Sequence, residues 1–196
     1  KAIVWTLLFE VLGLGCGSGP LTGRYIPPIV AFTHFLRPGT VRLAPWPDRV
    51  PLTAGHRRSL VDVVAFAGLV GLCLRALLAG EARLDAELLL PIVVVLAGLG
   101  LRDKTVFLAA RAEHYWVTVM CFVLAPAHAL AWIAGAKCVQ LALWFWAGVS
   151  KLNHHFPAVV CVMTSNSPVL RLPWLRKRMY RDYPHDLRPS RLAERL

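Results

Sequence analysis

Four ionisable side chains interrupt apolar stretches of the sequence in a pattern that predicts a polar cavity. Glu10 and Arg111 each lie about six residues, roughly 9 Å along a helix, from the same predicted end of their stretches. An ion pair between them would offset the cost of placing either charge in apolar surroundings. His114 continues the face of Arg111 at i+3. The predicted substrate or cavity-lining residues are Glu10, Arg111, Glu113 and His114.

The same polar groups also fit a purely structural role. Polar contacts between helices in a membrane are common and individually modest, so these side chains could hold the helices together without any ligand. Both interpretations stay open at this point. Asp62 and Arg75 lie nearer the ends of an apolar stretch, and they are predicted to reach the aqueous surface by extending along the helix.

No metal site is predicted. The five cysteines are scattered without a Cys-x-x-Cys motif, which a zinc site or a disulfide framework would favour. His154 and His155 are adjacent and would diverge by about 100° on a helix, so they cannot share an ion as an i, i+4 pair can. The cysteines are therefore interpreted as small buried hydrophobic residues.

The composition excludes an ordinary soluble domain. Hydrophobic residues make up 57% of the 196 residues and charged residues only 17%, and the mean hydropathy is +0.54. Soluble domains contain about 45–50% apolar and about 25% charged residues. The chain is therefore predicted to be an all-α integral membrane protein.

Five membrane-spanning helices are predicted from the apolar stretches, since about 20 apolar residues cross roughly 30 Å of hydrocarbon. The long segment between the first two contains many Gly and Pro residues, which favour an interfacial loop over a helix. Together these elements form a predicted transmembrane bundle over residues 1–170. The predicted spans are residues 2–16, 60–79, 84–101, 105–125 and 127–149, and the loop covers residues 17–59.

The basic residues support this arrangement. Seventeen of the 22 Lys and Arg residues fall in the 17–59 loop, the 102–104 turn and the chain after residue 149, which five spans would place on one face. An excess of Lys and Arg in short loops marks the cytoplasmic side of a membrane. A multi-pass protein of the cell (inner or plasma) membrane with cytoplasmic basic loops is therefore predicted.

The net charge of +11 is then explained by topology and by attraction to anionic lipid headgroups, and nucleic acid is not predicted as a partner. Residues 171–196 mix basic and apolar side chains, which is typical of an amphipathic cytoplasmic segment on the headgroups. A solvated basic flank explains this composition equally well. The predicted partners are the lipid bilayer, anionic headgroups, and proteins bound through the 17–59 loop and the 171–196 tail.

Several segments resemble an actinobacterial multispan membrane family of unknown function. They are residues 9–20 (FEVLGLGCGSGP), 43–53 (LAPWPDRVPLT), 100–104 (GLRDK), 144–157 (WFWAGVSKLNHHFP) and 163–168 (MTSNSP). The resemblance covers essentially the whole chain, and it implies further residues at both ends. The absence of an initiator Met before Lys1 fits that expectation.

A second resemblance concerns residues 147–153 (AGVSKLN), which are similar to the AGVKKLD motif of vitamin K-dependent gamma-carboxylases and the wider HTTM membrane proteins. It implies that Lys151 is a catalytic base acting on a reduced quinone. A lysine whose pKa is lowered by desolvation could accept such a proton. Ser150 and Asn153 depart from the motif, and Lys151 also suits a cytoplasmic anchor that ends a helix.

The primary functional hypothesis is a membrane-embedded protein of the HTTM or carboxylase type that handles a lipid or quinone-like amphiphile. No cofactor is predicted beyond the possibility of a quinone, and whether the protein is an enzyme stays open. The alternative is a non-catalytic membrane subunit that scaffolds or anchors partner proteins.

Overall fold

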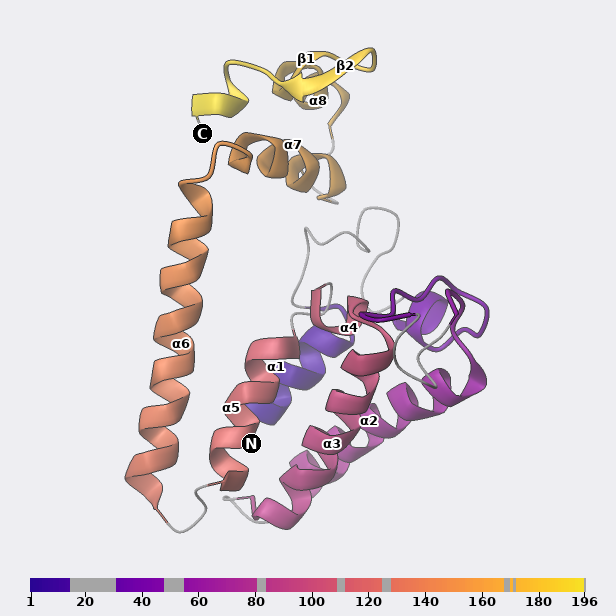
Figure 1. Cartoon of the computed structure of the whole chain (residues 1–196), viewed down its shortest axis with the longest axis vertical. Coiled ribbons are helices and arrows are strands. Elements are labelled where there is room, and N and C mark those ends of the chain that lie inside the picture. Colours follow the sequence, from indigo (N-terminus) through magenta and orange to yellow (C-terminus); the bar gives the residue numbers. More distant parts are fainter. Residues whose placement is uncertain are drawn as a thin grey trace.

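The computed structural model describes residues 1–14, 31–47, 55–80, 84–108, 112–124, 128–167, 170 and 172–195, and these residues are mostly helical (Figure 1). The larger helices of the described part are α1 (Ala2–Val11), α2 (Leu60–Leu78), α3 (Ala86–Arg102), α5 (Ala112–Leu124) and α6 (Ala129–Lys151). The shorter elements are a π-helix η1 (Ala31–Phe35), α4 (Thr105–Leu108), α7 (Phe156–Asn166), α8 (Pro173–Met179), β1 (Tyr180–Asp182), β2 (Asp186–Pro189) and a 3₁₀ helix η2 (Ala193–Arg195).

The start of α2 is fixed by a capping box. The Ser59 hydroxyl accepts a hydrogen bond from the Asp62 backbone N–H, and the Asp62 carboxylate accepts one from the Ser59 backbone N–H at 2.7 Å. This reciprocal pair satisfies two donors that a helix N-terminus otherwise leaves without partners. The predominantly apolar sequence that follows then continues the helix, which has 19 residues.

Helices α1, α2, α3 and α5 pack around one hydrophobic core. Its fully buried side chains come from all four helices, and the stacked rings of Phe35 and Phe66, 4.7 Å apart, attach η1 to α2. Gly100, near the end of α3, lets the ring of Phe107 pack directly against the helix, because a Cβ there would lie 2.1 Å from that ring. Core residues include Leu7, Val11, Leu69, Cys73, Ile92, Leu96, Val106 and Val119.

Helix α6 lies beside α5 and leaves most of its apolar surface uncovered. The two helices approach closely at Gly135, where a Cβ would lie 2.9 Å from Cys121 Sγ, and at Trp132, whose ring is 4.9 Å from that of Phe122. Along the rest of α6, large apolar side chains such as Leu141 and Trp144 are exposed. A long apolar helix exposed on nearly every side is expected where lipid surrounds it.

Two helices of the described part are long and apolar enough to cross a membrane, Leu60–Leu78 and Leu130–Lys151. Helices α1, α3 and α5 occupy the other predicted spans but have 10, 17 and 13 residues. The structure therefore supports a helical membrane protein with two candidate spans, and the five-span count stays a prediction.

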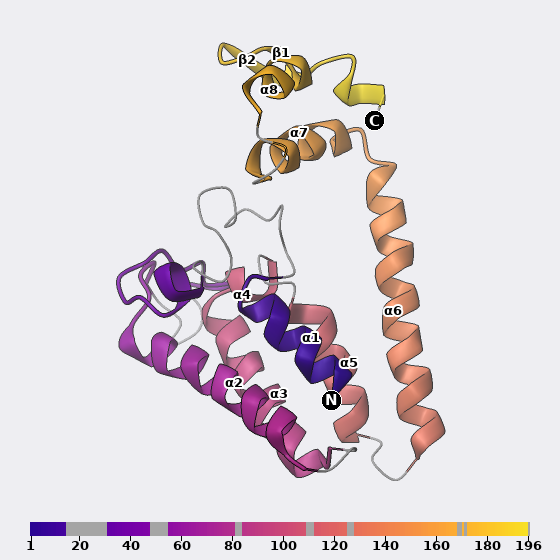
Figure 2. The ribbon, with the colours of Figure 1, turned by 180° about the vertical axis from the view of Figure 1, so that it is seen from behind.

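The direction of the chain reverses from helix to helix, so the helix ends gather at two ends of the molecule (Figures 1 and 2). The described residues of segment 31–59, the turn from α3 to α4 and the C-terminal elements α7 and α8 lie at one end, called here the basic end. The last turns of α2 and α5 and the first turns of α3 and α6 lie at the other. Three segments rich in Lys and Arg thus share one end of the molecule.

The C-terminal part folds as a small unit, the C-terminal module (residues 156–167 and 172–195). Strands β1 and β2 form an antiparallel hairpin in which Tyr180 pairs with Pro189 and Asp182 with Asp186. The module has its own core of buried Cys161, Met179, Tyr180 and Ala193. The predicted amphipathic segment 171–196 thus contains a seven-residue helix, a hairpin and a 3₁₀ turn.

Candidate functional site

Three of the four residues predicted to line a cavity are among the described residues, and they lie on helix ends at the basic end of the bundle. Glu10 is in the last turn of α1, and Glu113 and His114 are in the first turn of α5. The Glu113 carboxylate is 4.0 Å from His114 Nδ1. Arg111 lies outside the described residues, so the predicted Glu10–Arg111 pair stays a prediction.

Lys151, the predicted catalytic base, is the last residue of α6 and its side chain is exposed. None of the ion pairs found among the described residues includes Lys151. The structure therefore does not join Lys151 to these residues in one site.

The most extensive charged site of the described residues surrounds Asp62, which the sequence predicted at the aqueous surface. That prediction is wrong, since Asp62 and Arg42 are each only 2% exposed. Arg42 Nη1 lies 3.3 Å from Asp62 Oδ1, and Arg102 Nε donates to the same oxygen at 2.5 Å. Asp62 Oδ2 accepts hydrogen bonds from the backbone N–H and hydroxyl of Ser59 at 2.7 and 2.8 Å.

A second buried ion pair, Arg58–Asp103, lies beside the first at the basic end. Arg58 Nη2 binds Asp103 Oδ2, and Arg58 Nη1 donates to the carbonyl of His34 and to Thr40 Oγ1. Asp103 Oδ1 accepts from the Leu43 backbone N–H at 3.2 Å. The pair therefore connects segment 31–47 and Arg58 to the turn between α3 and α4.

The two groups of ion pairs attach the segment before α2 to the ends of α2 and α3. Arg42 and Arg58 come from the segment that precedes α2, whereas Asp62, Arg102 and Asp103 lie at the ends of α2 and α3. The carboxylates accept several hydrogen bonds each from protein groups, which is how buried charges are tolerated. This arrangement holds a Pro- and Gly-rich segment against the bundle, and we name it the double clasp (Arg42, Arg58, Asp62, Arg102, Asp103).

We expect stability to depend on pH through His34, whose carbonyl accepts a hydrogen bond from Arg58 of the double clasp. Burial, followed by the positive charge of Arg58, lowers the pKa of His34 below its usual 6.5, while Asp103 acts in the opposite direction. The unfolded chain therefore binds a proton more readily than the folded chain, and stability decreases as the pH falls through and below 6.5. Its buried Nε2 finds no hydrogen-bond partner among the described residues.

We expect the melting temperature to fall between about pH 7.5 and pH 5 and His34→Gln to reduce that fall, because Gln does not titrate. Thermal unfolding of both proteins over this range measures the difference. An unchanged pH profile in His34→Gln would show that other groups cause the loss. His56→Gln, in the exposed part of the same segment, is the matched control.

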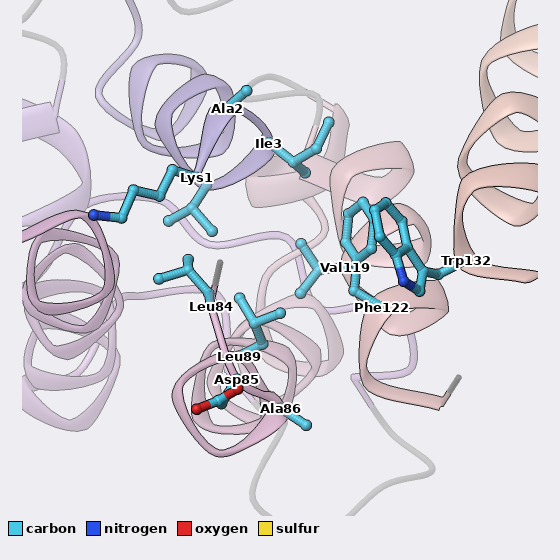
Figure 3. Close-up of a pocket in the computed structure, with 11 residues that line it drawn as sticks. Lys1, Ala2, Ile3, Leu84, Asp85, Ala86, Leu89, Val119, Phe122 and Trp132 are labelled. Carbon is cyan, nitrogen blue, oxygen red and sulfur yellow. The ribbon is translucent and has the colours of Figure 1, made fainter. Parts of the chain in front are cut away.

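An apolar cavity of about 460 Å³ lies at the end of the bundle opposite the double clasp (Figure 3). It is formed by the start of α1, the start of α3, the second half of α5 and the start of α6. The rings of Phe122 and Trp132 stand side by side on one wall, and Asp85 supplies a carboxylate. The lining residues are Lys1, Ala2, Ile3, Val4, Leu84, Asp85, Ala86, Leu89, Val119, Phe122 and Trp132.

None of the predicted site residues lines this cavity. Lys151 is 19 residues beyond Trp132 on α6, which corresponds to about 28 Å along the helix. Glu10 and His114 belong to the basic end. The sequence contained little signal for the cavity, because most of its wall consists of ordinary apolar side chains from four separate segments.

Over residues 1–196, the chain matches the family described as a transmembrane protein of unknown function (DUF3556). The chain belongs to this family. No curated protein and no solved structure matches it.

Membership in the DUF3556 family agrees with the exposed apolar surface of α6 and with the two candidate spans. The protein is therefore a transmembrane protein of an uncharacterised family. The resemblance to HTTM proteins and the actinobacterial origin stay predictions.

Proposed function

We propose that this DUF3556 protein binds an amphiphilic molecule of the membrane, a lipid or a quinone-like compound, in the apolar cavity. The cavity's size is the observation that supports this function most directly. Its volume of about 460 Å³ falls within the range of roughly 300–1,000 Å³ that is typical of small-molecule sites. Such sites are lined mainly by apolar and aromatic side chains with a few polar groups, as this one is.

The chemistry of the wall favours an amphiphile over a polar metabolite. Leu89 and Val119 are buried and offer only hydrocarbon, while Phe122 and Trp132 add flat aromatic surfaces. An isoprenoid or acyl chain gains about 0.8 kcal/mol for each methylene that it buries there. Asp85 is exposed at the start of α3, so a polar headgroup could lie beside it and remain in contact with water.

Narrowing the cavity should remove the ligand. Ala86 and Val119 both line it, and Ala86→Phe or Val119→Phe would place a ring in the space that the ligand needs. Loss of two buried methylenes costs about 1.6 kcal/mol, so we expect the affinity for the ligand to fall more than about tenfold and the amount of co-purifying ligand to fall with it. Mass spectrometry of small molecules that co-purify with the full-length protein in native lipid particles measures this.

Val94→Phe is the matched control, because Val94 lies on α3 with its side chain exposed and outside the cavity. Its ligand content should equal that of the wild type. If only bulk lipid is found with the wild-type protein, or if the cavity variants retain the ligand, the cavity is not the binding site.

A catalytic role for Lys151 is a separate proposal, supported by its position in the AGVSKLN motif at the end of α6. About 28 Å of helix separates Lys151 from Trp132, so it would act on a molecule at the basic end. Lys151→Ala should therefore leave occupancy of the cavity unchanged. Loss of the ligand in this variant would instead mean that the two sites are linked.

A scaffold function is the second candidate, and segment 31–47 supports it. The double clasp fixes this segment, yet Phe32, Val41 and Trp46 are large apolar side chains that remain exposed on it. Rigid exposed apolar groups on a basic surface suit a protein partner. Two results together would favour this function. One is a protein that co-purifies in stoichiometric amount and is lost on Phe32→Ser or Val41→Ser. The other is that only bulk lipid, and no specific small molecule, co-purifies. The 171–196 tail is the second proposed contact for such partners.

We also propose that the protein is a multi-pass protein of the plasma membrane, with five spans and the basic end in the cytoplasm. The gathering of segments rich in Lys and Arg at one end supports this orientation, because such segments are retained on the cytoplasmic side. Anionic headgroups are then the expected lipid partners of that end.

A further inference from the structure

Helix α7 has an apolar stripe that no described part of the protein covers. Val159, Val162 and Met163 are 46%, 52% and 38% exposed, and their i, i+3, i+4 spacing places them on one face. Cys161, by contrast, is 1% exposed and belongs to the core of the C-terminal module. Successive residues of a helix are about 100° apart, so Val159 and Met163 lie nearly opposite Cys161.

The orientation of α7 gives this stripe a direction. Figures 1 and 2 show α7 lying across the end of α6, with α8 and the hairpin on the side away from the bundle. Since Cys161 faces that module, the stripe faces the side on which α6 extends. If α6 crosses the bilayer, α7 therefore lies parallel to the membrane with its apolar face toward the lipid.

The side chains of α6 place the membrane boundary at the same level. Trp144, Phe145 and Trp146 are all exposed, and they precede the end of α6 by five to seven residues, about 8–10 Å. Exposed aromatic side chains at this position form the belt that is typical of the headgroup region. Lys151 then lies among the headgroups, and α7 begins five residues later.

The charge of the C-terminal module favours an anionic surface. Residues 171–196 contain eight Lys and Arg residues against three Asp and Glu residues. Lys177 and Arg178 of α8 are exposed, and Arg178 lies over the ring of Trp174, which is exposed as well. Positive charge near the bilayer attracts anionic lipids.

From these observations we propose that α7 is an interfacial helix that inserts the stripe Val159, Val162 and Met163 into the headgroup and acyl boundary of an anionic bilayer, thereby seating the C-terminal module on the membrane. The occupant of the stripe is lipid. This goes beyond the proposed cavity ligand and does not depend on it, because the cavity lies at the other end of the bundle.

Spin labels attached to single cysteines test the proposal in the full-length protein, reconstituted into lipid nanodiscs that contain anionic lipid. The five native cysteines are first replaced, and labels are then placed at positions 159, 162 and 163. Apolar oxygen and a polar nickel chelate report immersion in lipid and contact with water respectively. Leu187, on β2 and 60% exposed, is the matched control.

At each label we measure the ratio of oxygen accessibility to nickel accessibility. We expect this ratio at the three stripe positions to exceed the ratio at Leu187 by more than about threefold. In nanodiscs of zwitterionic lipid alone this ratio should fall. Nickel accessibility equal to that at Leu187 would show a solvated helix and overturn the proposal. Exclusion of both reagents would show that protein covers the stripe, which also overturns it. An equal ratio in both lipids would overturn the role of anionic lipid.

Replacement of Cys161 could disturb the module, so a second measurement uses the native sequence. A photo-crosslinking amino acid is incorporated at Val159 or, as the control, at Leu187. Lipid adducts at position 159 that are absent at position 187 support the interfacial helix. Protein adducts, or no adducts, at position 159 contradict it.

Discussion

Asp62→Asn is expected to lower the free energy of unfolding by about 3–5 kcal/mol, because removing one partner of a buried ion pair leaves the other charge uncompensated. Here two guanidinium groups lose their shared carboxylate, since Arg42 Nη1 and Arg102 Nε both contact Asp62 Oδ1. The substitution conserves shape and can still accept the hydrogen bond of Ser59. The loss of stability would therefore arise from the missing charge, and not from a change in side-chain volume or from a lost helix cap.

Thermal and denaturant unfolding of the full-length protein in detergent measure this loss. Asp186→Asn is the matched control, because Asp186 also binds an arginine, Arg188, at 2.7 Å, but on the exposed hairpin. Solvent screens exposed pairs, so this variant should unfold like the wild type. Equal stability of Asp62→Asn and the wild type would mean that the buried pair contributes nothing to the fold.

The exposed pair Asp186–Arg188 also bears on how stability depends on pH. The hydrogen bonds from Arg188 lower the pKa of Asp186 to about 2, so this carboxylate stays charged throughout the usual pH range. Changes in stability between pH 7 and pH 5 therefore do not arise from Asp186. Among the described residues of the basic end, His34 has a lowered pKa, and we expect it to contribute to a loss of stability in that window.

The sequence was sufficient for the class of protein and for the approximate positions of the long helices. Hydropathy marks α2 and α6 clearly, because each presents about 20 predominantly apolar residues. Within the predicted fourth span, 105–125, the structure describes α4 and α5, and residues 109–111 between them lie outside the described residues.

The role of Asp62 could not be predicted, for a specific reason. Its partners Arg42 and Arg102 lie 20 and 40 residues away, and neither spacing follows a local periodicity. The Pro and Gly residues before α2 predicted an irregular segment but not its path. Only Ser59-x-x-Asp62 offered a local signal, since this spacing fits a capping box.

The candidate cavity was missed in the sequence analysis because the residues that line it carry no distinctive signal. Sequence reasoning followed ionisable residues such as Glu10 and His114, because charges at membrane depth usually mark function. The cavity is instead lined by Leu89, Val119 and Phe122, whose types are the most common in any apolar helix. A space left between ordinary side chains becomes visible only when the helices are packed together.

The second large effect is expected at the other half of the double clasp. Asp103→Ala should cost about 3–5 kcal/mol, because Arg58 would remain buried without its carboxylate. The backbone N–H of Leu43 would also lose its acceptor. Since Arg58 and Leu43 belong to the segment before α2, the damage should be greatest there, and limited proteolysis within residues 37–47 should accelerate more than cleavage elsewhere.

A double variant shows whether the loss of stability comes from leaving one charge of the ion pair unpaired or from removing polar groups as such. Buried ion pairs replaced by apolar residues of similar volume are often close to neutral, so Arg58→Met with Asp103→Leu should recover more than half of the stability lost in Asp103→Leu alone. Arg181→Met with Glu194→Leu is the control, because that pair, at 3.6 Å, lies at the surface and should show no coupling. If the double variant at Arg58 and Asp103 instead loses the sum of the two single losses, the ion pair is not what attaches segment 31–58. The backbone bridge between Val41 and Arg57 and the stacking of Phe35 on Phe66 would then have to hold it.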